Sequence, residues 1–124
     1  FEIMYPMQMH ITDDLEAGRL EVKKSLALYV GGMGAKDKNF HNELVARMGY
    51  AEAAAKIQDL YLDGKKAEAV AAVPDELVDD IALVGPKDRI KQRLAAWEDS
   101  AVTSLLVWPK TPEDLETYAE LILD

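Results

Sequence analysis

The sequence has no cysteine and fewer basic than acidic side chains, and these shortages exclude several kinds of protein. Without cysteine there is no disulfide, no thiolate zinc site and no cysteine nucleophile. Lys and Arg number 14 against 23 Asp and Glu, which gives a formal net charge of −9. Because an acidic surface repels phosphate backbones and anionic lipid heads, we expect neither nucleic acid nor a membrane as a partner.

Long apolar runs are also missing. No run reaches the roughly 18 residues that a membrane span needs, and no basic stretch followed by an apolar one predicts a signal peptide. Together with the lack of cysteine, this favours a cytoplasmic protein. The 124 residues, 49 % of them hydrophobic, suffice for one folded domain with a buried core. The first residue is Phe1 rather than Met, so we interpret the sequence as a piece of a longer chain.

The opening segment Glu2–Ile11 alternates in the way that predicts a β-strand. Pro6 lacks an N–H group, so it indicates an edge position or a gap in the ladder. The predicted strand ends at Thr12, and the spacing of Asp13 and Glu16 predicts a helix N-cap at Asp13. One face of the strand is formed by Ile3, Tyr5, Met7, Met9 and Ile11.

The middle of the chain is expected to be helical. A first helix from Leu15 to Val30 carries an apolar stripe, and Gly31, Gly32 and Gly34 should end it. Glycines that follow a helix lie at its negative end, so we interpret this loop as a chain reversal rather than a phosphate site. The further predicted helices are Phe40–Met48, Ala51–Leu62, Lys65–Ala72, Pro74–Gly85 and a helix from Pro86 that buries Ile90, Leu94 and Trp97.

A second strand is predicted over Ala101–Trp108, followed by a helix over Glu113–Leu123. The apolar continuity of this strand indicates burial on both faces, as in a parallel sheet. Two strands cannot form a stable sheet by themselves, so the chain should lack parallel strands that the complete protein has.

Several segments resemble, in order along the chain, the luciferase-like oxidoreductases of the bacterial luciferase superfamily. The resemblance is to the branch that uses the deazaflavin coenzyme F-420, and it covers nearly the whole chain. The segments are Leu26–Gly34, Asn39–Asn42, Arg47–Tyr50, Ile57–Gly64, Val73–Asp79 and Leu83–Pro86, the last leading into Arg89–Ile90 and Arg93–Leu94.

The resemblance implies an α/β fold, namely a C-terminal fragment of a TIM (β/α)8 barrel that is mostly helical with about two strands. Residues 1–124 would be the C-terminal portion of a single barrel domain, because a complete barrel needs about 250 residues. Glu2–Ile11 would be its seventh strand and Thr103–Val107 its eighth. The N-terminal barrel strands, which in this family carry most cofactor contacts, would be missing.

The resemblance further implies hydride transfer between coenzyme F-420 and a small organic substrate in the full-length enzyme, with the fragment alone inactive. An FMN-dependent luciferase-like monooxygenase that acts on paired donors with molecular oxygen stays open as an alternative. A non-catalytic helical interaction module, favoured by the high helix content, stays open as another. The expected partners are the substrate and the missing barrel segment, and a homo-oligomer is left open.

Barrel enzymes place their chemistry at the carboxyl ends of the strands and in the loops that follow. This rule nominates His10, Thr12 and Asp13 after the first strand, and Trp108 and Lys110 after the second. His10 is a candidate acid or base, although it also fits a packed strand residue. Trp108 suits a pocket wall and barrel closure equally well.

Three other features complete the set of candidates. Arg47 is a candidate for contact with a substrate or cofactor anion on account of its charge. The segment from Gly85 to Asp88 fits an ordinary helix that begins with a proline, with anion binding at the helix N-terminus as the alternative. His10 and His41 are the only histidines and show no metal-ligand spacing, so no metal site is expected.

Overall fold

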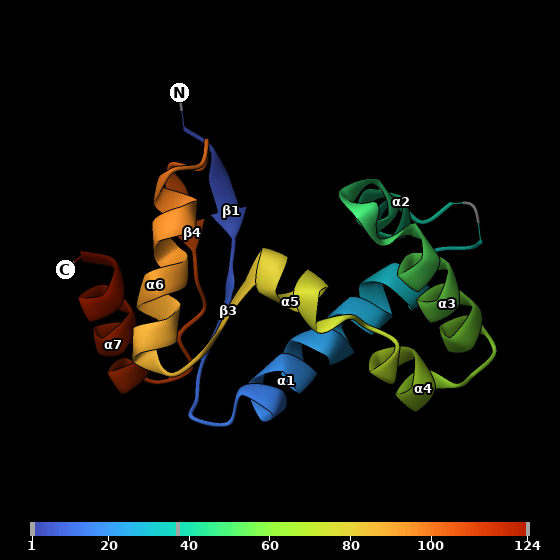
Figure 1. Cartoon of the computed structure of the whole chain (residues 1–124), viewed down its shortest axis with the longest axis horizontal. Coiled ribbons are helices and arrows are strands. Elements are labelled where there is room, and N and C mark those ends of the chain that lie inside the picture. The colour runs from blue at the N-terminus through green and yellow to red at the C-terminus, as the bar shows by residue number, and fades with distance from the viewer. Residues whose placement is uncertain (1, 37, 124) are drawn as a thin grey trace. The chain divides into compact units, whose positions relative to one another are not determined.

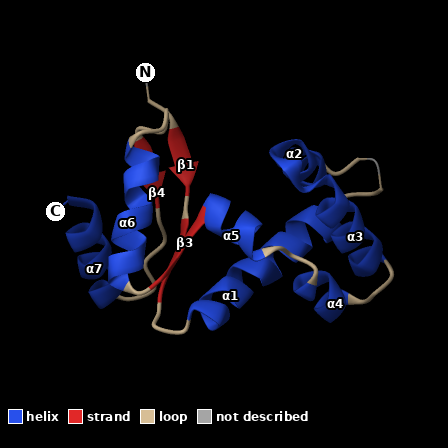
Figure 2. Cartoon of the chain, viewed as in Figure 1, coloured by secondary structure: helices blue, strands red, loops and turns tan. Residues whose placement is uncertain are grey.

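The computed structural model describes residues 2–36 and 38–123, with the backbone alone for 122 and 123. The chain forms two compact units. The first consists of Phe1–Gly18 and Ile81–Asp124, and the second of Arg19–Asp80. All the strands that the structure describes belong to the first unit (Figures 1 and 2).

The first unit is built on parallel strand pairs. β1 pairs with β4, and β2 pairs with β3. The helices α6 and α7 lie beside these strands (Figure 1). The elements are β1 (Met4–Pro6), β2 (Gln8–Ile11), β3 (Ala82–Gly85), β4 (Ser104–Leu106), α6 (Lys87–Glu98) and α7 (Pro112–Leu123).

The predicted strand Glu2–Ile11 exists, but it changes its partner at Met7. The N–H of Met7 donates to the carbonyl of Leu106, 2.8 Å away beside β4, whereas the N–H of Thr12 donates to the carbonyl of Gly85, 2.9 Å away at the end of β3. Successive N–H groups of a strand point to opposite sides, so the nitrogen of Pro6 faces the β3 side. The pairing with β3 begins only at Gln8, so the missing N–H leaves no gap in either ladder.

The core of the first unit confirms the predicted face of the opening strand from Tyr5 to Ile11, whereas Ile3 on the same face is 37 % exposed. Its buried members are Met7, Met9, Leu83, Ile90, Leu94, Tyr118 and Leu121, and Tyr5 and Ile11 pack against them. The hydroxyl of Tyr118 donates to the carbonyl of Met9 at 3.0 Å. The ring of Tyr5 lies 4.7 Å from that of Trp97. Burial raises the pKa of Tyr5 and, together with the charge of Asp114, that of Tyr118.

The predicted helix Pro74–Gly85 is wrong in its second half. The helix α5 covers Asp75–Ile81, and Ala82–Gly85 then forms the strand β3, in which every residue is buried. A short apolar run fits a helix stripe and a buried strand equally well, and the pairing with β2 decides between them. The strand β3 lies between the first and last strands in the chain, and the first strand pairs with both, with β4 through β1 and with β3 through β2. The numbering of the first and last strands as the seventh and eighth of the barrel stays a prediction.

The last strand, β4, is shorter and more exposed than predicted. It spans Ser104–Leu106, and Leu106 is 47 % exposed, so the expected burial on both faces is wrong for this chain. Among the described residues β4 pairs only with β1, which leaves its other edge without a strand. The predicted stripe of α6 is confirmed, since Ile90 and Leu94 are buried and Trp97 is half-buried.

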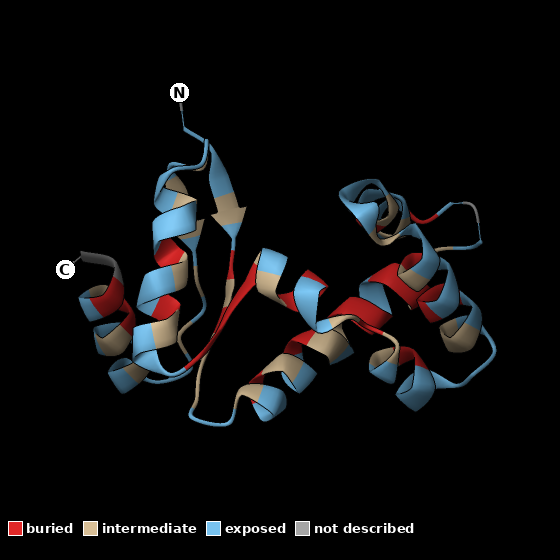
Figure 3. Cartoon of the chain, viewed as in Figure 1, coloured by how far each residue is buried: buried red, intermediate tan, exposed pale blue. Residues whose placement is uncertain are grey.

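The second unit is helical. Its interior includes the fully buried Val22, Val30, Ile57, Leu77 and Val78, and Figure 3 shows buried residues along α1, α3 and α5. The elements are α1 (Leu15–Ala27, which begins in the first unit), the π-helical turn η1 (Leu28–Gly32), α2 (Phe40–Val45), the π-helical turn η2 (Ala46–Tyr50), α3 (Ala51–Leu62), α4 (Lys66–Ala71) and α5 (Asp75–Ile81).

The glycines of the second unit play different roles. The predicted glycine stop is two residues early, because the helix continues through Gly31 and Gly32 as η1 and ends there, with Met33 as its C-cap. The two glycines also give room to Tyr61, since a Cβ atom at Gly31 would stand 2.6 Å from that of Tyr61. Gly49 and Gly64 have φ values of 104° and 81°, and they lie at the predicted ends of their helices.

An ion pair joins two residues near the ends of the chain segment that forms the second unit. The guanidinium of Arg19 on α1 donates to both carboxylate oxygens of Asp79 on α5, at 3.3 and 2.6 Å. Its Nη1 also lies 3.7 Å from Asp75. The hydrogen bond to Asp79 is the main cause that raises the pKa of Arg19.

Candidate functional site

The carboxyl ends of β2 and β3 lie side by side and form the edge at which barrel chemistry is expected. Ile11 and Gly85 are partners in the parallel register. Gly85 has a φ of 126°, and a Cβ atom there would stand 2.9 Å from Cδ of Arg89. The left-handed turn at Gly85 leads directly into Pro86 and α6.

His10 lies on this edge, half-buried, with Val84 as its register partner. Its Nε2 is 3.4 Å from the Oε1 atom of Gln8. Gly18, in the first turn of α1, approaches the same place, because a Cβ atom there would stand 2.5 Å from Val84 and 3.9 Å from the Cβ of His10. His10 is therefore a half-buried side chain near the end of a strand, with the first turn of α1 close beside it.

Thr12 and Asp13 follow in the loop between β2 and α1. The hydroxyl of Thr12 accepts a hydrogen bond from the N–H of Asp14 at 3.0 Å. Asp14, rather than Asp13, caps the helix, because its Oδ1 accepts from the N–H of Ala17 at 3.1 Å. The predicted cap is thus wrong by one residue, since the turn at Thr12 sets the register. Asp13 is exposed and free of the capping role.

Trp108 and Lys110 follow β4 and are both exposed, Trp108 to 61 %. The backbone N–H of Lys110 donates to the carboxylate of Asp114, 3.3 Å away. Because Leu106 is the register partner of Pro6, β4 ends five residues short of Ile11 along the neighbouring strand. This stagger corresponds to about 16 Å at 3.3 Å per residue.

Arg47 belongs to the second unit, where it lies exposed on the π-helical turn η2. The structure therefore brings His10 and Thr12 together at the end of β2, beside the first turn of α1. The other candidates of the first unit, Asp13, Trp108 and Lys110, lie in the loops that follow β2 and β4. No group of three His, Asp or Glu side chains able to hold a metal ion occurs among residues 2–36 and 38–123.

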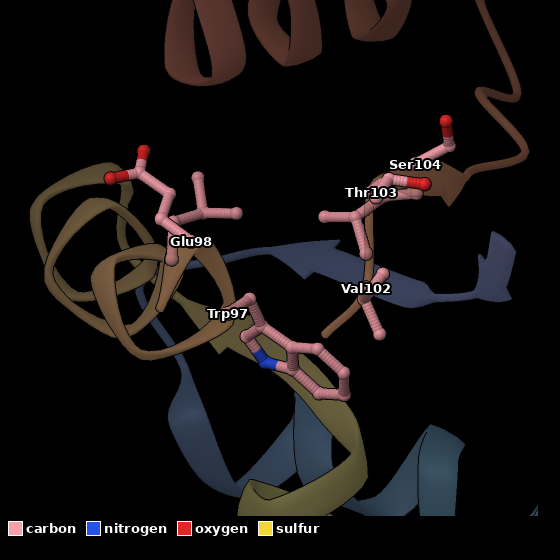
Figure 4. A pocket seen from close by; sticks show the side chains of 7 residues that line it. Trp97, Glu98, Val102, Thr103 and Ser104 are labelled. Atoms are coloured by element: carbon pink, nitrogen blue, oxygen red, sulfur yellow. The ribbon is translucent and has the colours of Figure 1, made fainter. Parts of the chain in front are cut away.

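An open cleft of about 320 Å³ lies elsewhere in the first unit (Figure 4). It is formed by the end of α6, with Trp97 and Glu98, and by the residues that lead into β4. Its lining is completed by Leu94, Val102, Thr103, Ser104 and Leu105. The cleft adjoins the amino end of its strand, whereas barrel enzymes act at the carboxyl edge, so we do not take it as the active site.

The sequence prediction missed a cluster of amide side chains in the second unit. Asn39 and Gln58 are buried there, and Asn42 and Glu43 line the same cavity of about 290 Å³. The only sequence signal is the position of Asn39 just before a helix, which favours an N-cap. The partner on α3 becomes visible only when the helices pack.

A model of the luciferase-like monooxygenase family matches residues 1–104, and the chain therefore belongs to this family. Together with the solved structure below, this confirms the predicted fold class, a fragment of a luciferase-like TIM barrel. In the part of the chain that the structure describes, no helix is long and apolar enough to cross a membrane.

One curated relative and one solved structure show what this chain is similar to. A Mycobacterium tuberculosis protein named putative coenzyme F-420-dependent oxidoreductase Rv3520c is 41 % identical over 122 residues, which cover 98 % of this chain and 35 % of the relative. The solved structure of the coenzyme F-420-dependent tetrahydromethanopterin reductase from Methanopyrus kandleri superposes with a TM-score of 0.67 at 18 % identity, covering 98 % of this chain and 33 % of that one. The chain thus spans about a third of the length of each.

Proposed function

We propose that the protein containing this chain is an oxidoreductase that transfers a hydride between coenzyme F-420 and a small organic substrate. The observation that carries the proposal is the 41 % identity to the mycobacterial relative, whose name gives this coenzyme. The parallel strands support it, because they end at one edge and place the candidates His10 and Thr12 there. They also argue against a purely helical interaction module.

The residues of this chain fit one wall of a site for a planar ring. When bound, the deazaflavin would supply the hydride chemistry, and the protein would orient it. The exposed indole of Trp108 offers an apolar surface, and Lys110 and Asp13 offer charges at the rim. His10 would hold or release a proton beside the substrate. Arg47, in the second unit, is kept as a separate candidate for contact with an anionic group.

The rest of the pocket would come from the remainder of the barrel. In this proposal residues 1–124 are the C-terminal portion of one barrel domain, and the chain alone is inactive. A cytoplasmic location is part of the same proposal.

The test is a fluorescence titration of the full-length protein with coenzyme F-420 and, in parallel, with FMN. We expect saturable binding of coenzyme F-420 and a loss of affinity of about tenfold, or ~1.4 kcal/mol, in Trp108→Ala. Leu115→Ala is the matched control, since Leu115 is an exposed apolar residue on α7, at 56 %. No binding of either cofactor would refute the proposal in favour of an interaction module.

An FMN-dependent monooxygenase that acts on paired donors with molecular oxygen is the second candidate. The description of the family, luciferase-like monooxygenase, favours it. Saturable binding of FMN without binding of coenzyme F-420, together with oxygen consumption on turnover, would establish this candidate in place of the first.

A further inference from the structure

The amide cluster of the second unit lines an open cavity of its own, and the exposed Glu43 lies at its mouth. Asn39 precedes α2, Asn42 and Glu43 lie within α2, and Gln58 lies on α3. Together they line a volume of about 290 Å³. A water molecule takes up about 30 Å³ in the liquid, so the space exceeds what one or two buried waters need. It lies at the lower limit of the ~300–1,000 Å³ of small-molecule sites.

The two asparagines are engaged with the backbone. Asn39 donates to the carbonyls of Tyr29 and Val30, at 3.0 and 2.9 Å, and its Oδ1 accepts from the N–H of Asn42 at 3.0 Å. The Nδ2 of Asn42 donates to the carbonyls of Val30 and Ala54, at 3.1 and 2.9 Å. The carbonyls of Tyr29 and Val30 belong to the π-helical turn η1, so these amides fix that turn to α2 and α3.

Gln58 differs from both asparagines. Its side chain is only 6 % exposed, yet its Nε2 has no hydrogen-bond partner among the described residues. A buried N–H group without a partner costs free energy, so native proteins rarely retain one without a compensating role. Gln58 lines the cavity, and an acceptor inside that cavity would satisfy it.

The polar groups that line the cavity define the kind of ligand that would fit it. The site offers one donor, the amide of Gln58, and two acceptors, the Oδ1 of Asn42 and the carboxylate of Glu43. A primary carboxamide carries the matching groups: a carbonyl that accepts a hydrogen bond, and a nitrogen whose two N–H groups donate one each. The Glu43 carboxylate and the net charge of −9 disfavour anions of the same shape, such as carboxylates.

We propose that this cavity binds a small molecule through its primary carboxamide group. The ligand carbonyl accepts from Gln58, and the ligand N–H groups donate to Asn42 and Glu43. The inference does not depend on the proposed hydride transfer, because it rests on residues of the second unit alone.

The test is ligand-observed saturation-transfer NMR on the protein at its natural length, with acetamide as the probe. We expect saturable transfer to the acetamide methyl group. Acetate, which is an anion, and N,N-dimethylacetamide, which keeps the carbonyl but has no N–H, should give little transfer. Gln58→Leu should weaken acetamide binding at least tenfold. Gln92→Leu is the matched control, because Gln92 is exposed on α6, and it should bind acetamide like the parent.

Denaturant unfolding of Gln58→Leu separates loss of the site from loss of the fold. Leu removes the unpaired amide and keeps a side chain of similar size, so the variant should be as stable as the parent or more stable. A marked loss of stability would mean that the amide is paired within the fold, which overturns the proposal. Absence of acetamide transfer in the parent, as for a cavity that holds water only, or equal transfer to all three probes, would overturn it as well.

Discussion

Gly18 should allow the first turn of α1 to pack closely against Val84 on β3 and Thr12 beyond β2. In an exposed helix a glycine is about 1 kcal/mol less favourable than alanine, so Gly18→Ala would ordinarily stabilise. Here the added Cβ atom would stand 2.5 Å from Cγ1 of Val84 and 2.9 Å from Cγ2 of Thr12. Carbon atoms prefer a separation of about 3.5–4.0 Å, so one side must move by roughly 1 Å.

Val84 cannot move easily, because it is fully buried in β3 and β3 is paired with β2. Overpacking of this kind costs about 1–3 kcal/mol, against a gain in helix propensity of about 1 kcal/mol. We therefore expect Gly18→Ala to lower the free energy of unfolding by up to about 2 kcal/mol, as measured by urea unfolding followed by circular dichroism.

A double-mutant cycle with Val84→Ala tests the physical reason. Val84→Ala removes the methyl group that clashes, so the double variant should be more stable than the sum of the single changes predicts, by about 1–2 kcal/mol. Additive effects within about 0.5 kcal/mol, or a stabilising Gly18→Ala, would refute the close approach of α1 to β3.

Asp14→Ala should lower the free energy of unfolding by about 1 kcal/mol, because its carboxylate caps α1, and Asp13→Ala should change it by less than about 0.5 kcal/mol; equal losses in urea unfolding would contradict the assigned cap. Tyr118→Phe should cost about 1 kcal/mol in the same assay, because it removes a buried hydrogen bond to a strand carbonyl; an unchanged midpoint would count against that bond. The hydrogen bond to Asp80 is the main cause that raises the pKa of Tyr50 from 10.0 to about 12. Its stabilisation should therefore be complete below pH 10 and vanish as the pH rises towards about 12. The amplitude of the late tyrosinate titration, to which Tyr5 and Tyr118 also contribute, should fall by one tyrosine in Tyr50→Phe.

Elements with a strong local signal could be predicted from the sequence. The bounds of α3 match the prediction, because an apolar stripe precedes a glycine at which the chain must adopt a positive φ, Gly64. The face formed by Tyr5, Met7, Met9 and Ile11 was also predicted, since alternation in a strand leaves only one apolar side.

The sequence nominated candidate site residues, and only the structure shows how they are arranged. The barrel rule identified His10 and Thr12, and both lie at the carboxyl end of β2. The exact cap was missed, because Asp13 and Asp14 are chemically alike and only the turn at Thr12 selects between them. Gln58 could not be found at all, since a lone glutamine within a helix carries no local signal.

The sequence by itself determined the local features of the chain. These are the approximate ends of most helices, the apolar face of the opening strand and the family motifs. The tertiary structure alone decided that Ala82–Gly85 is a strand, that Gly31 and Gly32 continue a helix beside Tyr61, and that Gln58 joins the asparagines around a cavity. The physical reason is the range of the interactions. Capping and periodicity act within one or two turns, whereas ladder pairing and side-chain packing join residues that are distant in the chain.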